Sequence, residues 1–214
     1  MELNQNRLYN AKQTQSVSRY FSTFIQHIDV VQSLDNTISL IGPSLGYVPS
    51  EEYEKYKSLY TSLSPNGYKK GLLLGLGEGI LVSVLTQMFP RIDLTAIEID
   101  PTRERIARDQ FHLDSLPALQ IIFGDATETV ETLEESYDLI HVDLCLDGRL
   151  EQKCYTIRFW ESLLRLLAPQ GQIIFEVREK YPNNLNPIYS YLFRKGMSDS
   201  RLQTSNSTIH YFTL

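Results

Sequence analysis

Short runs of apolar residues alternate with amphipathic segments from residue 67 to the end of the chain. Apolar runs bounded by turn residues predict buried strands, and apolar positions three and four residues apart predict helices. This alternation predicts an α/β domain, a mostly parallel sheet with helices on both faces, whose ligands bind at the carboxyl ends of the strands. The predicted strands are Lys70–Gly75, Asp93–Ile99, Leu119–Phe123, Tyr137–Asp143, Gln172–Val177 and two more within 199–214; the predicted helices are Gly79–Phe89, one capped by Asp100, a short one capped by Thr127, Gln152–Leu167 and Pro187–Lys195.

The beginning of the chain has a different pattern. Residues 1–20 are rich in Gln, Asn and Ser, and we expect them to be poorly ordered. The β-branched runs that follow are broken by turn residues, which predicts a small β-hairpin or meander, and Ser50 then caps a helix. Because Ser64-Pro65-Asn66-Gly67 is a cluster of turn residues, we divide the chain into an N-terminal region, 1–66, and a main domain, 67–214.

The composition restricts the classes of partner. The net charge is -6, the isoelectric point is near 5.3, and no basic stripe is present, so we expect no nucleic-acid partner. Cys145, Cys154 and the scattered histidines have no metal-site spacing, so we expect no metal. The N-terminus lacks the apolar core of a signal peptide, and the apolar window Gly71–Pro90 is interrupted by Glu78. We therefore expect a cytoplasmic protein without a membrane span.

A glycine-rich turn follows the first strand of the main domain, in GLLLGLGEGI. Its glycines are Gly75, Gly77 and Gly79, and Ile80 stands where a dinucleotide fingerprint needs a glycine. Glu78 would repel a pyrophosphate and suits a cation instead. The ammonium of S-adenosylmethionine fits this charge, while the helix N-terminus can receive its carboxylate. The alternative is that the segment is only a tight turn between a strand and a helix.

Acids end the next two strands. Glu98 lies about 20 residues beyond the glycine turn, where an acid accepts hydrogen bonds from ribose hydroxyls, and Ile99 can pack on the adenine face. Asp125, followed by Ala126 in the same FGDA segment, can accept a hydrogen bond from the adenine amine. A solvated acid for Glu98 and a helix-capping acid for Asp125 are the alternatives.

Asp143 ends the fourth strand, beside the glycine turn. An acid at this position can hold an amine substrate or take its proton. Asp147 follows in the loop, where an Asp-Gly turn is the simpler interpretation. We expect His141 to point away from the side of Asp143 and to be a core residue.

These motifs, in this order, resemble the spermidine synthase-like branch of the class I methyltransferase-fold proteins. The resembling segments are FIQHIDVV, SEEYEKYKSLY, GLGEG, EID, GDA, YDLIHVD and LLAPQGQII, between about Gln26 and Val177. The resemblance implies a Rossmann-like sandwich with a seven-stranded sheet, preceded by a small β region, that binds S-adenosylmethionine or its decarboxylated form. It implies that Gln26 reaches the ligand, that Glu78 lies near the ligand's amine, that Asp143 is the catalytic acid, and that the nucleoside site is lined by Gly75, Gly77, Gly79, Glu98 and Asp125.

The acceptor half departs from this family. Its polyamine-making members carry D-S-S/T-D-P, where this chain has Asp143-Leu144-Cys145-Leu146-Asp147-Gly148, and Tyr-His-Glu, where it has Tyr56-Lys57-Ser58. Ser205-Asn206-Ser207-Thr208 replaces their Tyr-Pro-Ser-Gly. We therefore expect methyl transfer to a small acceptor, an amine being one candidate. Aminopropyl transfer and a non-catalytic binding protein are the alternatives. A nicotinamide-dependent oxidoreductase is disfavoured by Ile80 and Glu78. The resemblance is also compatible with a homodimer.

Overall fold

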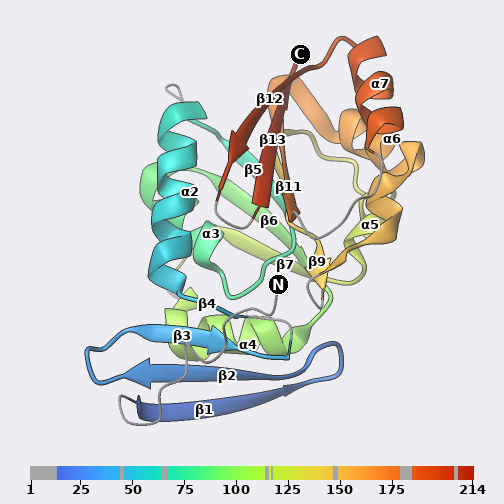
Figure 1. Ribbon diagram of the computed structural model, residues 1–214. Helices are drawn as coiled ribbons and strands as arrows, with labels where there is room; N and C mark the ends of the chain where they lie inside the picture. The colour runs from blue at the N-terminus through green and yellow to red at the C-terminus, as the bar shows by residue number, and fades with distance from the viewer. Residues whose placement is uncertain are drawn as a thin grey trace.

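The computed structural model describes residues 14–43, 46–63, 67–113, 116, 118–146, 149–178, 185–204 and 207–214. Its larger sheet has seven strands in the order β12-β13-β11-β8-β5-β6-β7 (Figure 1). The strands β5 to β8 and β11 pair in parallel, and β13 pairs antiparallel with both β11 and β12. The bounds are β5 Lys70–Leu74, β6 Asp93–Glu98, β7 Leu119–Phe123, β8 Tyr137–Val142, β11 Leu167–Arg178, β12 Ser198–Gln203 and β13 Ser207–Thr213.

Helices cover both faces of this sheet (Figure 1). One face carries α2 (Pro49–Leu63) and α3 (Ile80–Met88), whose side chains form one buried cluster with apolar residues of β5, β8 and β11. The other carries α5 (Ala126–Thr129), α6 (Ile157–Leu166) and α7 (Asn186–Arg194). At the centre of that second face Trp160 is fully buried, with its ring edge-on to Phe175 and Phe212, and its indole N–H donates to the Cys154 carbonyl. The prediction of a seven-stranded sandwich is therefore confirmed.

A second, antiparallel sheet precedes the sandwich. Its strands are β1 (Thr14–Ser22), β2 (Gln26–Ser33), β3 (Ile38–Ile41) and β4 (Gly46–Tyr47), paired in this order. The sheet packs on α4 (Pro101–Phe111), because Ile106 of that helix is buried in one cluster with the apolar side chains of β2 and β3 (Figure 1). The predicted β region is thus present. Whether it is a domain of its own, as the division at residue 66 predicts, stays a prediction.

Several local predictions are wrong. Residues 14–20 lie in β1, because they pair with β2; residues 1–13 lie outside the described residues. The helix predicted over Gln152–Leu167 is two segments, the 3-10 turn η2 (Gln152–Tyr155) and α6, since Thr156 is extended and its hydroxyl caps Phe159. The short helix α5 is capped by Asp125 rather than by Thr127. The hairpin β9 (Cys145–Leu146) and β10 (Arg149–Leu150) is an addition that the hydrophobic pattern does not reveal.

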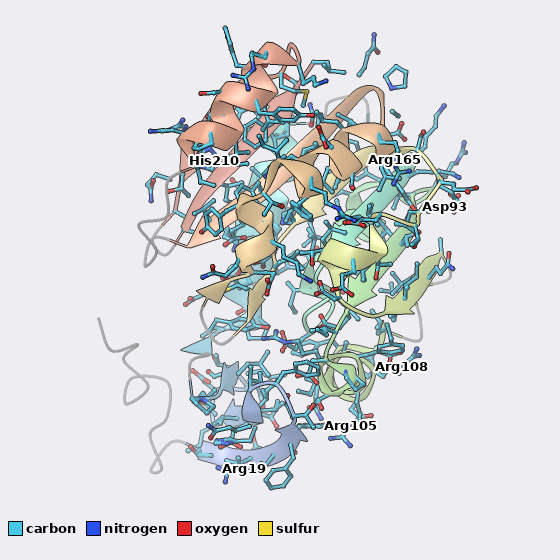
Figure 2. All side chains as sticks on the ribbon, turned by 90° about the vertical axis from the view of Figure 1, so that its right-hand side faces the viewer. Arg19, Asp93, Arg105, Arg108, Arg165 and His210 are labelled. Atoms are coloured by element: carbon cyan, nitrogen blue, oxygen red, sulfur yellow. The ribbon has the colours of Figure 1, made fainter. Side chains whose placement is uncertain are left out.

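The carboxyl ends of the parallel strands face the N-terminal sheet. Figure 2 shows Asp93, the first residue of β6, far from Arg19 of β1, while Arg105 of α4 lies over the ring of Tyr20 of β1. The small sheet is fastened there: Ser22 donates to the carboxylate of Asp100 (2.6 Å), the residue that caps α4. The sheet β1–β4 therefore covers the carboxyl edge of the large sheet, where a ligand is expected. Among the helices of the described residues, none is long and apolar enough to cross a membrane.

Candidate functional site

The turn between β5 and α3 is built from glycines in left-handed conformations. Gly75, Gly77 and Gly79 have φ angles of 97°, 54° and 79°. At Gly75 the reason is also steric, because a Cβ added there would lie 2.4 Å from the carbonyl oxygen of Asp143. The amide of Asp143 in turn donates to the Leu74 carbonyl (3.0 Å). The glycine turn and the acid after β8 are thus in direct backbone contact, as the topology of the sequence predicts.

Glu98 holds the glycine turn in place. Its carboxylate is buried, and one oxygen accepts the backbone N–H groups of Leu76 and Gly77, both at 3.0 Å. The other oxygen accepts the N–H of Asp100 at 2.8 Å. Burial raises the pKa of Glu98, an effect that Arg103 and the amides of Gly77 and Asp100 oppose. The residue is therefore a scaffold for the turn, and the ribose contact that the sequence indicates stays a prediction.

Glu78 does not face the site as a solitary negative charge. Its side chain is only 1% exposed, and it is paired with the guanidinium of Arg103 (3.1 Å), from the first turn of α4. The hydroxyl of Tyr47, at the end of β4, donates to the same carboxylate. Burial alone would lower the pKa of Arg103, but Glu78 and Glu98 raise it well above its usual value. The guanidinium therefore stays charged in its buried position.

This ion pair corrects the electrostatic reasoning made from the sequence. The sequence predicts a carboxylate at the turn that repels a pyrophosphate and suits a cation of the ligand. Instead, Arg103 neutralises Glu78, and its side chain is the more exposed of the two, at 13%. Its Nη1 atom lies 3.7 Å from where a Cβ of Gly77 would be, so a cation lies beside the turn. A direct contact between Glu78 and a ligand stays a prediction.

The remaining predicted cofactor residues surround the same edge. Asp125 caps α5 through its contact with the Thr127 amide (2.9 Å), and its second oxygen accepts from Lys153 (3.1 Å). Hydrogen bonds from Thr127 and Lys153 outweigh burial and lower the pKa of Asp125. Ala126 is buried, whereas Ile99, at 37% exposure, presents an apolar surface next to Glu98. A ligand contact of these residues is untested.

Gln26 lies at the tip of the β1–β2 hairpin. It is exposed and paired with Ser22, the residue that donates to Asp100. The hairpin tip thus meets the carboxyl edge of the large sheet, but among the described residues no hydrogen bond joins Gln26 itself to the glycine turn. Its role toward a ligand stays a prediction.

A cluster of charged and phenolic groups lies around Asp143, which we call the acceptor cluster: Glu52, Lys55, Tyr56, Asp143 and Glu176. The Tyr56 hydroxyl lies 3.3 Å from Asp143 Oδ2 and 3.0 Å from Glu176 Oε2. The ammonium of Lys55 lies 3.2 Å from Glu176 and 2.5 Å from Glu52. The cluster therefore joins α2 to the carboxyl ends of β8 and β11.

His141 lies under this cluster. Its ring meets Tyr56 edge-on, with ring centroids 5.5 Å apart, and its Nδ1 atom is 2.6 Å from the hydroxyl of Tyr60. Burial lowers the pKa of His141 to about 4, against the opposing charges of Asp143 and Glu176. The prediction of a core residue is confirmed. The predicted direction is wrong, because residues two apart on a strand share a face and Tyr56 contacts both His141 and Asp143.

Sequence reasoning missed Arg103, Lys55 and Glu176. Each had a signal. Arg103 places a cation in the first turn of a helix, where the macrodipole disfavours one. Glu176 is a single acid within the apolar run IIFEV, and Lys55 is three residues after Glu52 on the helix face that must cover that strand. None of these signals names a partner, because the partners come from distant parts of the chain.

The described residues do not indicate a site of another kind. Within the described ranges, no three His, Cys, Asp or Glu side chains are grouped as a metal site would need. A surface hollow lined by Lys70, Asp93 and Tyr137 lies at the amino ends of the strands, away from the glycine turn. Asp147, Gly148, Ser205 and Asn206 lie outside the described residues.

Known proteins match this arrangement. Residues 72–175 match the family model of a methyltransferase domain. Polyamine aminopropyltransferase 1 of Streptomyces coelicolor is 26% identical over 135 residues, which are 59% of this chain and 25% of that protein. The matched part of the chain spans 25% to 44% of the length of the first three curated polyamine aminopropyltransferases.

Solved structures share the fold over most of the chain. Spermidine synthase from Thermotoga maritima has a TM-score of 0.64 at 15% identity and covers 94% of this chain and 72% of its own. The O-methyltransferase TomG of Streptomyces achromogenes, solved with S-adenosylmethionine, has a TM-score of 0.60 at 14% identity, covering 75% and 79%. Together with the sequence matches, they show that the chain has the S-adenosylmethionine-dependent methyltransferase fold and is similar to spermidine synthase-like proteins.

Proposed function

We propose that this protein binds S-adenosylmethionine at the turn after β5 and transfers its methyl group to a small acceptor beside Asp143. The observation that carries the proposal is the ion pair of Arg103 with Glu78. S-adenosylmethionine ends in an α-amino carboxylate, which has both charges, whereas its decarboxylated form ends in an ammonium alone. A turn with a cation beside it favours the ligand that keeps its carboxylate.

The start of α3 strengthens this preference. Gly79 caps the helix without a side-chain hydrogen bond, so the first N–H groups of α3 are directed at the turn with no capping oxygen from Gly79. Such amides bind anions, and the guanidinium of Arg103 is the more exposed member of its ion pair with Glu78, so it can still contact a carboxylate. A bare ammonium at the same place would meet the guanidinium. We therefore expect S-adenosylmethionine to bind at least about tenfold more tightly than the decarboxylated form, a difference of about 1.4 kcal/mol.

Asp143 is the group that would accept the acceptor's proton. The bound sulfonium supplies an electrophilic methyl group. The acceptor heteroatom forms the new bond to that carbon, the sulfur keeps the electron pair of the broken bond, and the proton passes to the carboxylate of Asp143. The Tyr56 hydroxyl lies 3.3 Å from this carboxylate and 3.0 Å from that of Glu176, so its single hydrogen is shared between the two acids. Asp143→Asn should therefore reduce turnover much more than the affinity for the donor.

Isothermal titration calorimetry tests the donor. S-adenosylmethionine, its decarboxylated form and methylthioadenosine are titrated into the native protein, Arg103→Gln and Arg105→Gln. Arg105 is the matched control, because it lies on the same helix but stacks on Tyr20 at the surface. We expect the preference for the carboxylate to shrink in Arg103→Gln and to persist in Arg105→Gln. Equal affinities of the native protein for the two donors would contradict the proposal.

Aminopropyl transfer is the second candidate, favoured by the names of the curated relatives. Mass spectrometry of the products separates the two. Methyl transfer releases S-adenosylhomocysteine, whereas aminopropyl transfer releases methylthioadenosine. An amine acceptor, a cytoplasmic location, a homodimer and the absence of a nucleic-acid partner stay predictions from the sequence.

A further inference from the structure

The ammonium of Lys55 is surrounded as a bound amine would be. It lies 2.5 Å from a carboxylate oxygen of Glu52 and 3.2 and 3.3 Å from the two oxygens of Glu176. It also lies 4.2 Å from the centroid of the Tyr56 ring. Two carboxylates and an aromatic face are the groups that recognise an alkylammonium ion. The chain itself supplies the ion that fills this place.

The place adjoins the proposed reacting group. The Tyr56 hydroxyl contacts Glu176 and Asp143, so one side chain joins the cation's carboxylate to the acid beside the glycine turn. Burial alone would lower the pKa of Lys55, but the charges of Glu176, Glu52 and Asp143 raise it. Lys55 is therefore a permanent cation within the electrostatic field of Asp143.

Fold stability alone does not require this arrangement. The Glu176 side chain has no solvent exposure. The residues before and after it in β11, Phe175 and Val177, are buried and apolar. A buried ion pair is often no more stabilising than apolar side chains of the same volume, because both charges lose their hydration. An acid at this position costs little only while a cation neutralises it. Its presence points to a cation site that the lysine now occupies.

We propose that Lys55 occupies the position of an acceptor amine, so that the protein excludes alkylamines and acts on an acceptor without a positive charge. This inference rests on the proposed function for the identity of the reaction. The cation site itself is a separate matter, since it can be measured without a donor. A second ammonium ion beside Asp143 would meet the charge of Lys55, which makes a diamine a poor ligand of the native protein.

Thermal unfolding of Lys55→Ala in the presence of propylamine tests the site. Alanine keeps the β-carbon, so propylamine replaces the atoms that are removed. We expect a lower unfolding midpoint that propylamine and putrescine raise, by about 5–10 °C at a hundredfold excess over the dissociation constant. Sodium chloride of equal ionic strength and propanol should have no such effect. Lys57→Ala is the matched control, because Lys57 lies on the same helix with a half-exposed side chain.

Three results would overturn the proposal: no response of Lys55→Ala to amines, an equal response of Lys57→Ala, or a native protein whose midpoint putrescine raises as strongly. If Lys55→Ala does not fold alone, refolding yield with propylamine against sodium chloride gives the same information. Lys55→Met fills the space without a charge, so its midpoint should not respond to amines. If amines raise the midpoint of Lys55→Ala but the native protein does not bind S-adenosylmethionine, the amine site is supported and the proposed function is refuted.

Discussion

Replacing Glu98 should cost stability before any ligand is added. In the structure its carboxylate accepts three backbone N–H groups, from Leu76, Gly77 and Asp100, at 2.8 to 3.0 Å. A hydrogen bond to a charged group contributes about 1.5–3 kcal/mol, and water that enters the space left by alanine recovers part of this. We therefore expect Glu98→Ala to lower the free energy of unfolding by about 3–5 kcal/mol, and the unfolding midpoint by about 10 °C.

The variant Glu98→Gln should lose only part of the free energy of unfolding that Glu98→Ala loses. The amide oxygen can keep the pair of bonds to Leu76 and Gly77, while its NH₂ group faces the N–H of Asp100, so one of three bonds is lost. We expect an intermediate loss of about 1–3 kcal/mol. Urea denaturation of both variants measures it, with Glu104→Gln as control, because Glu104 pairs with a partly exposed Arg108 on the helix α4.

The same variants separate the scaffold from the ribose contact. Calorimetry with S-adenosylmethionine is carried out on Glu98→Gln at a temperature where the variant is folded. A loss of affinity for S-adenosylmethionine that is larger in Glu98→Gln than in the control Glu104→Gln would support the ribose contact. If Glu98→Ala and Glu104→Gln have the same denaturation midpoint, the reasoning about the three amides is wrong.

Two further predictions concern the glycine turn and the buried His141 of β8. Gly75→Ala should lose about 2–3 kcal/mol more stability than Gly77→Ala, because both have positive φ but only the first places a Cβ 2.4 Å from the Asp143 carbonyl; equal urea midpoints would contradict this. The pKa of His141, lowered by burial from 6.5 to about 4, makes the folded protein lose about 3 kcal/mol as the pH falls from 6.5 to 4, since the unfolded chain binds the proton first. In His141→Gln this part of the acid dependence should vanish, and a parallel pH profile of the two proteins would refute the assignment.

The strands of the sandwich were predictable because burial on both faces leaves a continuous apolar run. In β5, four of the five residues are buried, and the strand ends one residue before its predicted end. The edge strand β7 has no buried residue, yet it agrees with the predicted Leu119–Phe123 in every residue. The start of β11 was not predictable. Ala168-Pro169-Gln170-Gly171 has the composition of a turn, yet it lies within the strand, where Gln170 has a φ of 64° and the pairing with β8 shifts register. The turn-like composition of this segment marks a register shift within β11 and not the end of a strand.

The acids of the site were predictable for a related reason. Strand ends are readable from the sequence, and in a parallel sheet they meet at one edge, so Glu98, Asp125 and Asp143 could be placed together. The sign of the charge that each acid meets was not readable. It depends on side chains that reach the edge from helices, and helical spacing fixes the face of a helix but not the element that the face covers.

The two internal cations show why this matters for inferring a ligand. Arg103 is 25 residues from Glu78, and Lys55 is 121 residues from Glu176. Arg103 pairs with Glu78, the carboxylate to which sequence reasoning assigned the ammonium of the donor, and we propose that Lys55 takes the place of the acceptor amine near Asp143. Once the chain provides both cations, the carboxylates no longer argue for cationic ligands. They argue for a donor that brings its own carboxylate to Arg103 and for an acceptor that brings no charge to Lys55. An acid in a predicted site therefore indicates the charge of a ligand only after the ion pairs within the protein have been assigned.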